Sequence, residues 1–317
     1  MNFREKLAIT SQKNNSLLCV GLDPYQKMIT TEDELFSLNR LIVEATGDLA
    51  CAYKPNLAIY EGMGKEGLSA LEQTLEFIRE TNPDTPIIGD GKRGDIGNCS
   101  LAYTRMLFEK YEFDAVTANP YMGYDSIEPF TQYKDKGIFI LCRTSNPGGQ
   151  DIQELIVMQK GKASARPLYE VVAELALEWN QNNNVGLVVG ATYPKQIAHI
   201  RQICPNMLFL IPGVGFQGGD IQKTVQCAAD AQGGGFIINV SRQIMNVAKT
   251  SADKLRKPTE AKKDMHFVAR CVRDEINACL PTLPKESQQV CDGNRNKAKQ
   301  LVFPQEETTP MATKSGR

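Results

Sequence analysis

Histidine, excess charge and long apolar runs are scarce in this sequence, and each shortage argues against a class of protein. Only two of the 317 residues are histidine, which leaves little for zinc chemistry. Lys plus Arg number 36 against 37 for Asp plus Glu, so the net charge of −1 gives no electrostatic basis for binding nucleic acid or an acidic membrane. No apolar run approaches the roughly 18 residues of a membrane span. Any phosphate that the protein binds must therefore be held by a local site.

The nine cysteines do not form the pattern of a disulfide-bonded secreted protein. Their number is odd, none belongs to a CxxC pair, and several lie inside apolar runs. The opening segment is charged and lacks the apolar core of a secretory signal. We therefore expect reduced, buried thiols and a cytoplasmic location.

Short apolar runs rich in β-branched residues recur eight times along the chain. Each is apolar on both sides, as expected for strands buried on both faces of a parallel sheet. Segments with helical spacing lie between them, and one places Leu35, Leu38 and Ile42 on a single stripe. Eight such alternations predict an α/β fold, a closed (β/α)8 or TIM barrel, with an open doubly wound sheet as the alternative. The eight runs are 17–23, 49–56, 86–92, 115–121, 137–145, 185–192, 208–215 and 235–242.

The barrel is expected to fill residues 1–280 as a single domain. A short helix over 2–13 should lie under the barrel, and a last helix should begin near Pro258. The gap of 48 residues between the starts of strands five and six is the longest, and its excess, 145–163, is predicted to be a lid on the C-terminal face. Residues 281–317, with four prolines and little periodicity, are predicted to be a disordered tail or a linker.

Charged side chains follow several of these strands directly, at the edge where barrel active sites are found. Asp90 and Lys92 are two residues apart on strand three, so both are expected to face the barrel mouth. Lys54, at the end of strand two, can reach the same space, and Asp95 lies in the loop beyond. Alternating ammonium and carboxylate groups would keep one another ionised. An ordinary strand-end salt bridge is the alternative for a lone D-x-K pattern.

A phosphate site is predicted at the loops after strands seven and eight, where barrels commonly place one. Gly213 and Gly215, with Gly218 and Gly219, let backbone N–H groups approach an anion closely. Arg242, after strand eight, can bind a phosphate through two parallel hydrogen bonds. A plain glycine turn is the alternative for the glycines alone.

Five motifs resemble those of orotidine 5′-phosphate decarboxylase, in its longer bacterial-type branch. They are LLCVGLDP at strand one, YKPN at strand two, DGKRGDIGN at strand three, TANPYMGYDSIEPF at strand four and PGVGFQGGD at strand seven. The resemblance runs from about residue 3 to residue 280. The D-x-K-x-x-D core alone is shared with a wider group of phosphosugar barrels, so its KRGDIGN context and the PGVGFQGGD loop carry the specificity.

The resemblance implies that the protein decarboxylates orotidine 5′-monophosphate to UMP, in pyrimidine nucleotide synthesis, without metal or cofactor. Lys92 would stabilise the carbanion left at C6 and then protonate it, with Asp90 near the departing carboxylate. Lys54 would link that carboxylate to the ribose hydroxyls. Asp95 would enter the site of the neighbouring subunit, which implies a homodimer with two shared sites.

The same resemblance assigns substrate-binding roles to residues at other strand ends. Asp23 would bind ribose hydroxyls, and Ser145 would read the pyrimidine edge. Where the family typically has a threonine this chain has Cys99, so the resemblance implies a weaker ribose contact across the dimer interface. The residues that would hold the phosphate are Gln217, Ser241 and Arg242.

Two other functions fit parts of the pattern. A phosphosugar lyase or epimerase on the same barrel would use a divalent metal, but a metal here would face the ammonium group of Lys54. A catalytically silent nucleotide-binding protein would keep the phosphate loop and lose the charged cluster, which this chain retains in full. Both stay open from the residues alone, and turnover in the presence of a metal chelator separates them from a metal-free decarboxylase.

Overall fold

The structure of the protein is a computed structural model. It describes residues 1–24, 29, 31–158, 161, 164–215, 218–248 and 257–280. The predicted tail at 281–317 and the predicted phosphate ligand Gln217 lie outside the described residues. Four residues of the predicted lid, 159, 160, 162 and 163, lie outside them as well.

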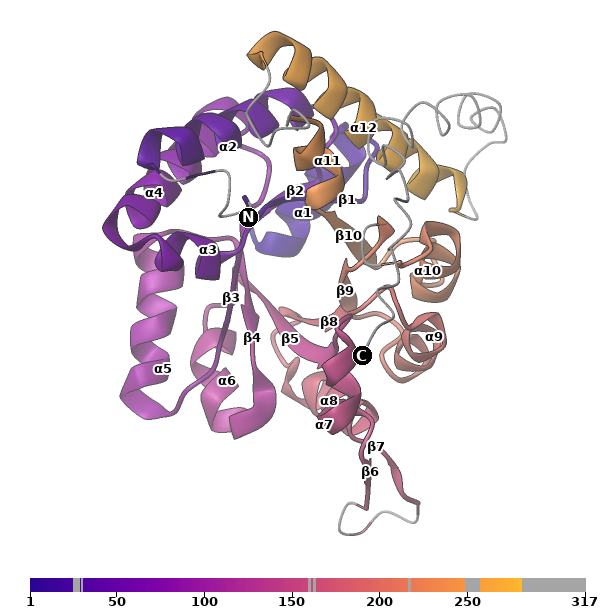
Figure 1. The fold of residues 1–317 in the computed structure, drawn as a ribbon. Helices are drawn as coiled ribbons and strands as arrows, with labels where there is room; N and C mark the ends of the chain where they lie inside the picture. Colours follow the sequence, from indigo (N-terminus) through magenta and orange to yellow (C-terminus); the bar gives the residue numbers. More distant parts are fainter. Residues whose placement is uncertain are drawn as a thin grey trace, which may run out of the picture.

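Eight parallel strands form one sheet in the order β2-β1-β10-β9-β8-β5-β4-β3, and the sheet closes into a barrel (Figure 1). Isolated parallel bridges join the two end strands at Tyr53–Ile87 and Asn56–Asp90. The predicted (β/α)8 barrel is therefore confirmed, and the open doubly wound sheet is wrong. All eight predicted strands are present: β1 Leu18–Leu22, β2 Ala52–Pro55, β3 Ile88–Arg93, β4 Ala115–Ala118, β5 Gly137–Arg143, β8 Val185–Val189, β9 Leu208–Pro212 and β10 Phe236–Val240.

Helices cover the outside of the barrel because each can bury an apolar stripe against the strands. In α2 (Glu32–Thr46) the stripe includes Leu35 and Leu38, and Thr31 and Glu34 form a capping box at the helix start. No helix among the described residues is long and apolar enough to cross a membrane. The other helices are α1 Phe3–Lys13, α3 Leu57–Gly62, α4 Gly64–Thr81, α5 Gly97–Thr104 with its π-helical continuation η1 Arg105–Lys110, η2 Pro120–Met122, α6 Tyr124–Thr131, α8 Leu168–Trp179, α9 Pro194–Ile203, α10 Ile221–Ala228, α11 Arg242–Met245, η5 Asn246–Ala248 and α12 Pro258–Ala278.

The barrel interior is filled by apolar side chains at the N-terminal end of the strands. The predicted helix α1 contributes Phe3, whose ring packs edge-to-face on Phe139 with the ring centroids 5.8 Å apart. Cys19, Ile88 and Leu210 belong to the same buried cluster. This end of the barrel is filled by packed apolar side chains, and the large cavity lies at the opposite, C-terminal end of the strands.

The long segment after β5 carries more structure than a plain loop. It contains a turn of 3-10 helix (η3, Pro147–Gly149), the short helix α7 (Gln150–Gln153) and an antiparallel hairpin of β6 (Ile156–Val157) and β7 (Arg166–Pro167). Figure 1 shows this hairpin projecting from the body of the barrel. The role of the segment as a lid stays a prediction.

Candidate active site

A cavity of about 1700 Å³ opens at the C-terminal ends of the strands. Its walls combine apolar residues of the barrel with charged residues from the ends of several strands. The predicted residues Asp95 and Gly215 are not among those that line it. The predicted site residues that do line it are Asp23, Lys54, Asp90, Lys92, Ser145, Gly213, Ser241 and Arg242.

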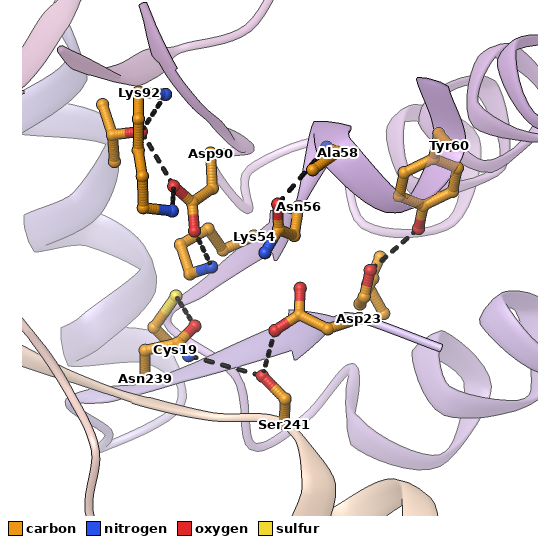
Figure 2. A network of polar contacts seen from close by, with 12 residues as sticks. Cys19, Asp23, Lys54, Asn56, Ala58, Tyr60, Asp90, Lys92, Asn239 and Ser241 are labelled. Atoms are coloured by element: carbon orange, nitrogen blue, oxygen red, sulfur yellow. Dashed lines mark hydrogen bonds and ion pairs between the residues drawn. The ribbon is translucent and has the colours of Figure 1, made fainter. Parts of the chain in front are cut away.

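Asp90, which lines this cavity, lies between two lysines (Figure 2). Its Oδ2 accepts a hydrogen bond of 2.7 Å from Lys54 Nζ, and its Oδ1 accepts one of 2.6 Å from Lys92 Nζ. The Lys54 side chain is buried, whereas that of Lys92 is 46% exposed. Lys92 is thus the member of the cluster that can present its ammonium group to a ligand in the cavity.

The backbone at Lys92 departs from regular strand geometry. Its φ is 49°, in the left-handed region that non-glycine residues rarely adopt, and the pairing of β3 with β4 shifts register between Gly89 and Arg93. The Lys92 N–H donates to Thr117 Oγ1 at 2.9 Å, and that hydroxyl donates to Asp90 Oδ1 at 2.8 Å. Both side chains line the cavity, as predicted, although the pairing of β3 with β4 is irregular between them.

The electrostatics of the cluster keep its buried members ionised. Burial alone would raise the pKa of Asp90, but the ammonium groups of Lys54 and Lys92 hold it well below its usual range. Burial alone would lower the pKa of Lys54, but the charges of Asp23 and Asp90 raise it above its usual value. A negative charge and a positive charge are thus fixed side by side in the cavity at neutral pH.

Asp23, at the end of β1, lies on the other side of Lys54 from Asp90 in Figure 2. Its Oδ2 accepts a hydrogen bond of 2.6 Å from Ser241 Oγ. Its Oδ1 is buried and has no hydrogen-bond partner among the described residues. Ser241, which was predicted to bind phosphate, is therefore engaged with the residue predicted to bind ribose.

The described glycines of the loop after β9 are linked to one another by backbone hydrogen bonds. Gly213 and Gly215 have φ of 99° and 68°, values that favour glycine. The N–H groups of Gly215, Gly218 and Gly219 all donate to carbonyls within the loop, at 3.0, 2.8 and 3.1 Å. These three amides are occupied, which differs from the expectation that the glycines offer N–H groups to an anion. Arg242, the first residue of α11, lines the cavity and supplies a cation there.

Arg143 has no predicted role, yet its side chain is fully buried at the end of β5. The guanidinium pairs with Glu154, which follows α7, at 3.0 Å. It also donates to the Thr144 carbonyl at 2.7 Å and lies 3.6 Å from the centroid of the Tyr193 ring. These contacts tie the segment after β5 to the barrel. The available signal in the sequence is an arginine that directly ends an apolar run.

Ser145 lies in the segment after β5 that the contacts of Arg143 tie to the barrel. Its carbonyl accepts a hydrogen bond of 3.0 Å from Thr192 Oγ1, in the loop after β8. A Cβ on Gly190 would lie 2.5 Å from the Ser145 backbone, so glycine is required for this close approach. The backbone of Ser145 is thus fixed from two sides at the edge of the cavity.

Asp95 lies in the loop between β3 and α5, apart from the lysine pair of its own chain. Its Oδ1 accepts a hydrogen bond of 2.7 Å from the N–H of Ile96, and it does not line the cavity. Cys99 is exposed on the following helix. Sequence spacing suggested that Asp95 adds a fourth charge, and within one chain the structure does not bring it to the other three.

No group of three or more His, Cys, Asp or Glu side chains placed to hold a metal ion occurs among the described residues. The structure is a (β/α)8 barrel with a cluster of lysine and aspartate at the C-terminal ends of its strands, the end at which barrel enzymes place their active sites. The family model described as Orotidine 5'-phosphate decarboxylase / HUMPS family matches residues 16–256. The chain belongs to this family, which confirms the resemblance of its motifs.

Curated relatives and solved structures extend the match over most of the chain. The orotidine 5'-phosphate decarboxylase of Ralstonia pickettii (strain 12J) is 46% identical over 285 residues, 87% of this chain and 98% of the relative. That of Cupriavidus metallidurans is 49% identical over 255 residues, 78% of this chain and 91% of the relative. The structure of Leishmania donovani OMP decarboxylase is 38% identical, with a TM-score of 0.75 and coverage of 88% of this chain and 98% of that one.

Proposed function

We propose that this chain decarboxylates orotidine 5′-monophosphate to UMP in pyrimidine nucleotide synthesis, with Lys92 as the residue that stabilises and then protonates C6. Membership of the decarboxylase family and relatives named for this activity at 46–49% identity support the reaction. The observation that carries the role of Lys92 is its hydrogen bond of 2.6 Å to Asp90 at the wall of the cavity.

The chemistry demands a fixed cation beside C6. When the bond from C6 to the carboxylate breaks, its electron pair stays on C6, where no adjacent carbonyl can delocalise it. A preorganised ammonium group stabilises that pair without solvent reorganisation. Lys92 then transfers one proton to C6 and regains a proton from water. Asp90, whose carboxylate lies beside Lys92, is placed to orient the ammonium and to neighbour the departing carboxylate.

The remaining cavity residues divide between ribose, base and phosphate. We assign Lys54 and Asp23 to the ribose hydroxyls. Both residues line the cavity, and Asp23 Oδ1 has no hydrogen-bond partner among the described residues, so it can accept from a ribose hydroxyl. Ser145 is assigned to the pyrimidine edge. The phosphate is assigned to Arg242 of the cavity and, from the family resemblance, to Gln217, since the N–H groups of Gly215, Gly218 and Gly219 are engaged within their own loop.

We propose further that two chains pair and exchange Asp95 between their sites. A partner would explain why Asp95 lies outside the cavity of its own chain. The segments that follow β3 and β4 also expose several large apolar side chains, as an interface would require. They are those of Ile96, Leu101, Tyr121 and Met122.

The thiols support a reducing, cytoplasmic location. Cys19, Cys51, Cys142 and Cys204 are buried and form no disulfide bond. Neither rival function gains support from the cavity. A metal placed at Asp90 would face two ammonium groups, and a silent binder would have no use for them.

The absorbance change on loss of orotidine 5′-monophosphate, followed in EDTA with purified protein, tests this function. We expect wild type to convert the substrate to UMP and Lys92→Ala to lose at least about 10³-fold in kcat while still binding UMP. Lys65→Ala, at an exposed position of α4, is the matched control and should behave as wild type. Wild-type turnover that EDTA abolishes would favour the metal-dependent lyase. Binding of UMP without any turnover would favour the silent nucleotide-binding protein.

A further inference from the structure

A row of hydrogen bonds runs between β1 and β10, from Cys19 through Asn239 and Ser241 to Asp23 (Figure 2). Ser241 Oγ donates to Asp23 Oδ2 at 2.6 Å, and Asn239 Nδ2 donates to Ser241 Oγ at 3.4 Å. Cys19 Sγ in turn lies 3.7 Å from Asn239 Oδ1. The row exists because β1 and β10 are paired in the barrel with Cys19 opposite Asn239.

The direction of each hydrogen bond in the row is set by chemistry. An ionised carboxylate only accepts, so the single proton of the Ser241 hydroxyl must point to Asp23. The hydroxyl lone pair then faces the Asn239 amide. A phosphate oxygen is also only an acceptor and would need that same proton. Ser241 therefore cannot donate to a phosphate while it holds Asp23.

The carboxylate of Asp23 is left with one free oxygen. Its Oδ1 is buried and without a hydrogen-bond partner among the described residues, and the residue lines the cavity. A buried acceptor without a donor is costly, so a ligand hydroxyl in the cavity is the natural partner. With Oδ2 fixed by Ser241, Oδ1 is aimed in one direction.

The backbone around Asp23 leaves space for the hydrogen bond from Ser241 to Asp23. A Cβ on Gly21 would lie 1.9 Å from Ser241 Oγ, so only glycine leaves room for the hydroxyl. The end of β1 is held from the other side, where Tyr60 Oη donates to the Leu22 carbonyl at 2.9 Å. The segment that carries Asp23 is thus held on both sides. Gly21, two residues before Asp23, leaves space for the Ser241 hydroxyl.

We propose that Ser241 is a positioning residue for Asp23, which it aims at the ribose hydroxyls of the nucleotide, and that it is not a phosphate ligand. The proposal rests on the proposed function, in which Asp23 binds ribose. It replaces the phosphate-binding role that the family resemblance implied for Ser241.

The affinities of Ser241→Ala for UMP and for 2′,3′-dideoxy-UMP test the proposal, because the analogue keeps the phosphate and lacks the hydroxyls. We expect UMP to bind about tenfold more weakly than to wild type and the analogue to bind equally to both proteins. Arg242→Ala, the comparator, should weaken both ligands. A loss of the same size for both ligands in Ser241→Ala would overturn the proposal.

A double-mutant cycle with Asp23→Ala separates a positioning role from general damage. Since Ser241 acts through Asp23, adding Ser241→Ala to Asp23→Ala should cost no further affinity for UMP, and additive losses would contradict this. Ser241→Cys keeps the shape of the side chain and donates a hydrogen bond only weakly. If Ser241→Ala fails to fold, Ser241→Cys must show the same loss of affinity for UMP but not for the analogue without hydroxyls.

Wild-type turnover is measured in parallel. A wild type that neither converts orotidine 5′-monophosphate nor binds UMP overturns the proposed function and this inference together. Equal losses of affinity for the two ligands in Ser241→Ala, with normal wild-type turnover, overturn this inference alone.

Discussion

Lys92 donates a hydrogen bond of 2.6 Å to Asp90 Oδ1 from a backbone held in the left-handed region, with φ of 49°. That conformation costs a non-glycine residue about 1–2 kcal/mol. The hydrogen bond from the Lys92 N–H to Thr117 and the ion pair with Asp90 offset this cost. The strained position lies where the proposed reaction takes place, so the strain serves to aim the ammonium group.

Two inactive variants should differ in stability because of this backbone. Lys92→Gly is expected to be more stable than Lys92→Ala by about 1 kcal/mol, since glycine adopts a positive φ without strain. Urea unfolding of both variants measures the difference. Lys263, exposed within α12, is the matched control, and there the glycine variant should be the less stable by about 1 kcal/mol. The same order at both positions would contradict the account.

Asp90→Asn should destabilise the protein by roughly 3–5 kcal/mol at neutral pH, because it leaves the buried Lys54 ammonium without its closest partner. The folded-state pKa of Asp90 is lowered, so its contribution is complete above the unfolded value of about 4 and is lost as pH falls below it. The folded-state pKa of Lys54 is raised, so its contribution is complete below about pH 10 and is lost at higher pH.

The difference in unfolding free energy between wild type and Asp90→Asn should therefore be flat around neutrality and shrink below about pH 4. Urea unfolding at several pH values measures it. Asp84, which pairs with exposed Lys13, is the control, and Asp84→Asn should have a much smaller effect because solvent screens that pair. A difference that stays constant into acid would show that folding does not lower the pKa of Asp90.

The barrel could be predicted from the sequence because each of its eight strands is apolar on both faces, a local pattern. Charged residues toward the C-terminal ends of such strands, such as Lys54 and Asp90, lie at one end of the barrel whatever the side-chain details. The left-handed φ of Lys92 could not be predicted, because it accompanies a register shift in the pairing of β3 with β4, a contact between segments distant in sequence. The Ser241–Asp23 bond joins residues 218 apart in the chain and depends on how the barrel closes.

The Arg143–Glu154 ion pair holds the segment after β5, and with it the backbone of Ser145. Glu154→Gln should raise KM for orotidine 5′-monophosphate about tenfold with a smaller change in kcat, because a loosened segment weakens binding more than chemistry. Steady-state kinetics measure both constants. Glu44→Gln, which alters the exposed pair with Arg40 on α2, should leave both unchanged. An unaltered KM in Glu154→Gln would mean that the ion pair does not position the substrate-binding segment.

In the proposed dimer, each reaction centre combines Lys92 of one chain with Asp95 of the other. Co-expression of Lys92→Ala and Asp95→Ala chains with different tags allows the mixed dimer to be purified and its decarboxylation rate measured. One of its two sites then has both residues intact, so we predict about half of the wild-type activity, although both parent proteins are severely impaired. A mixed dimer no more active than its parents would contradict the shared site.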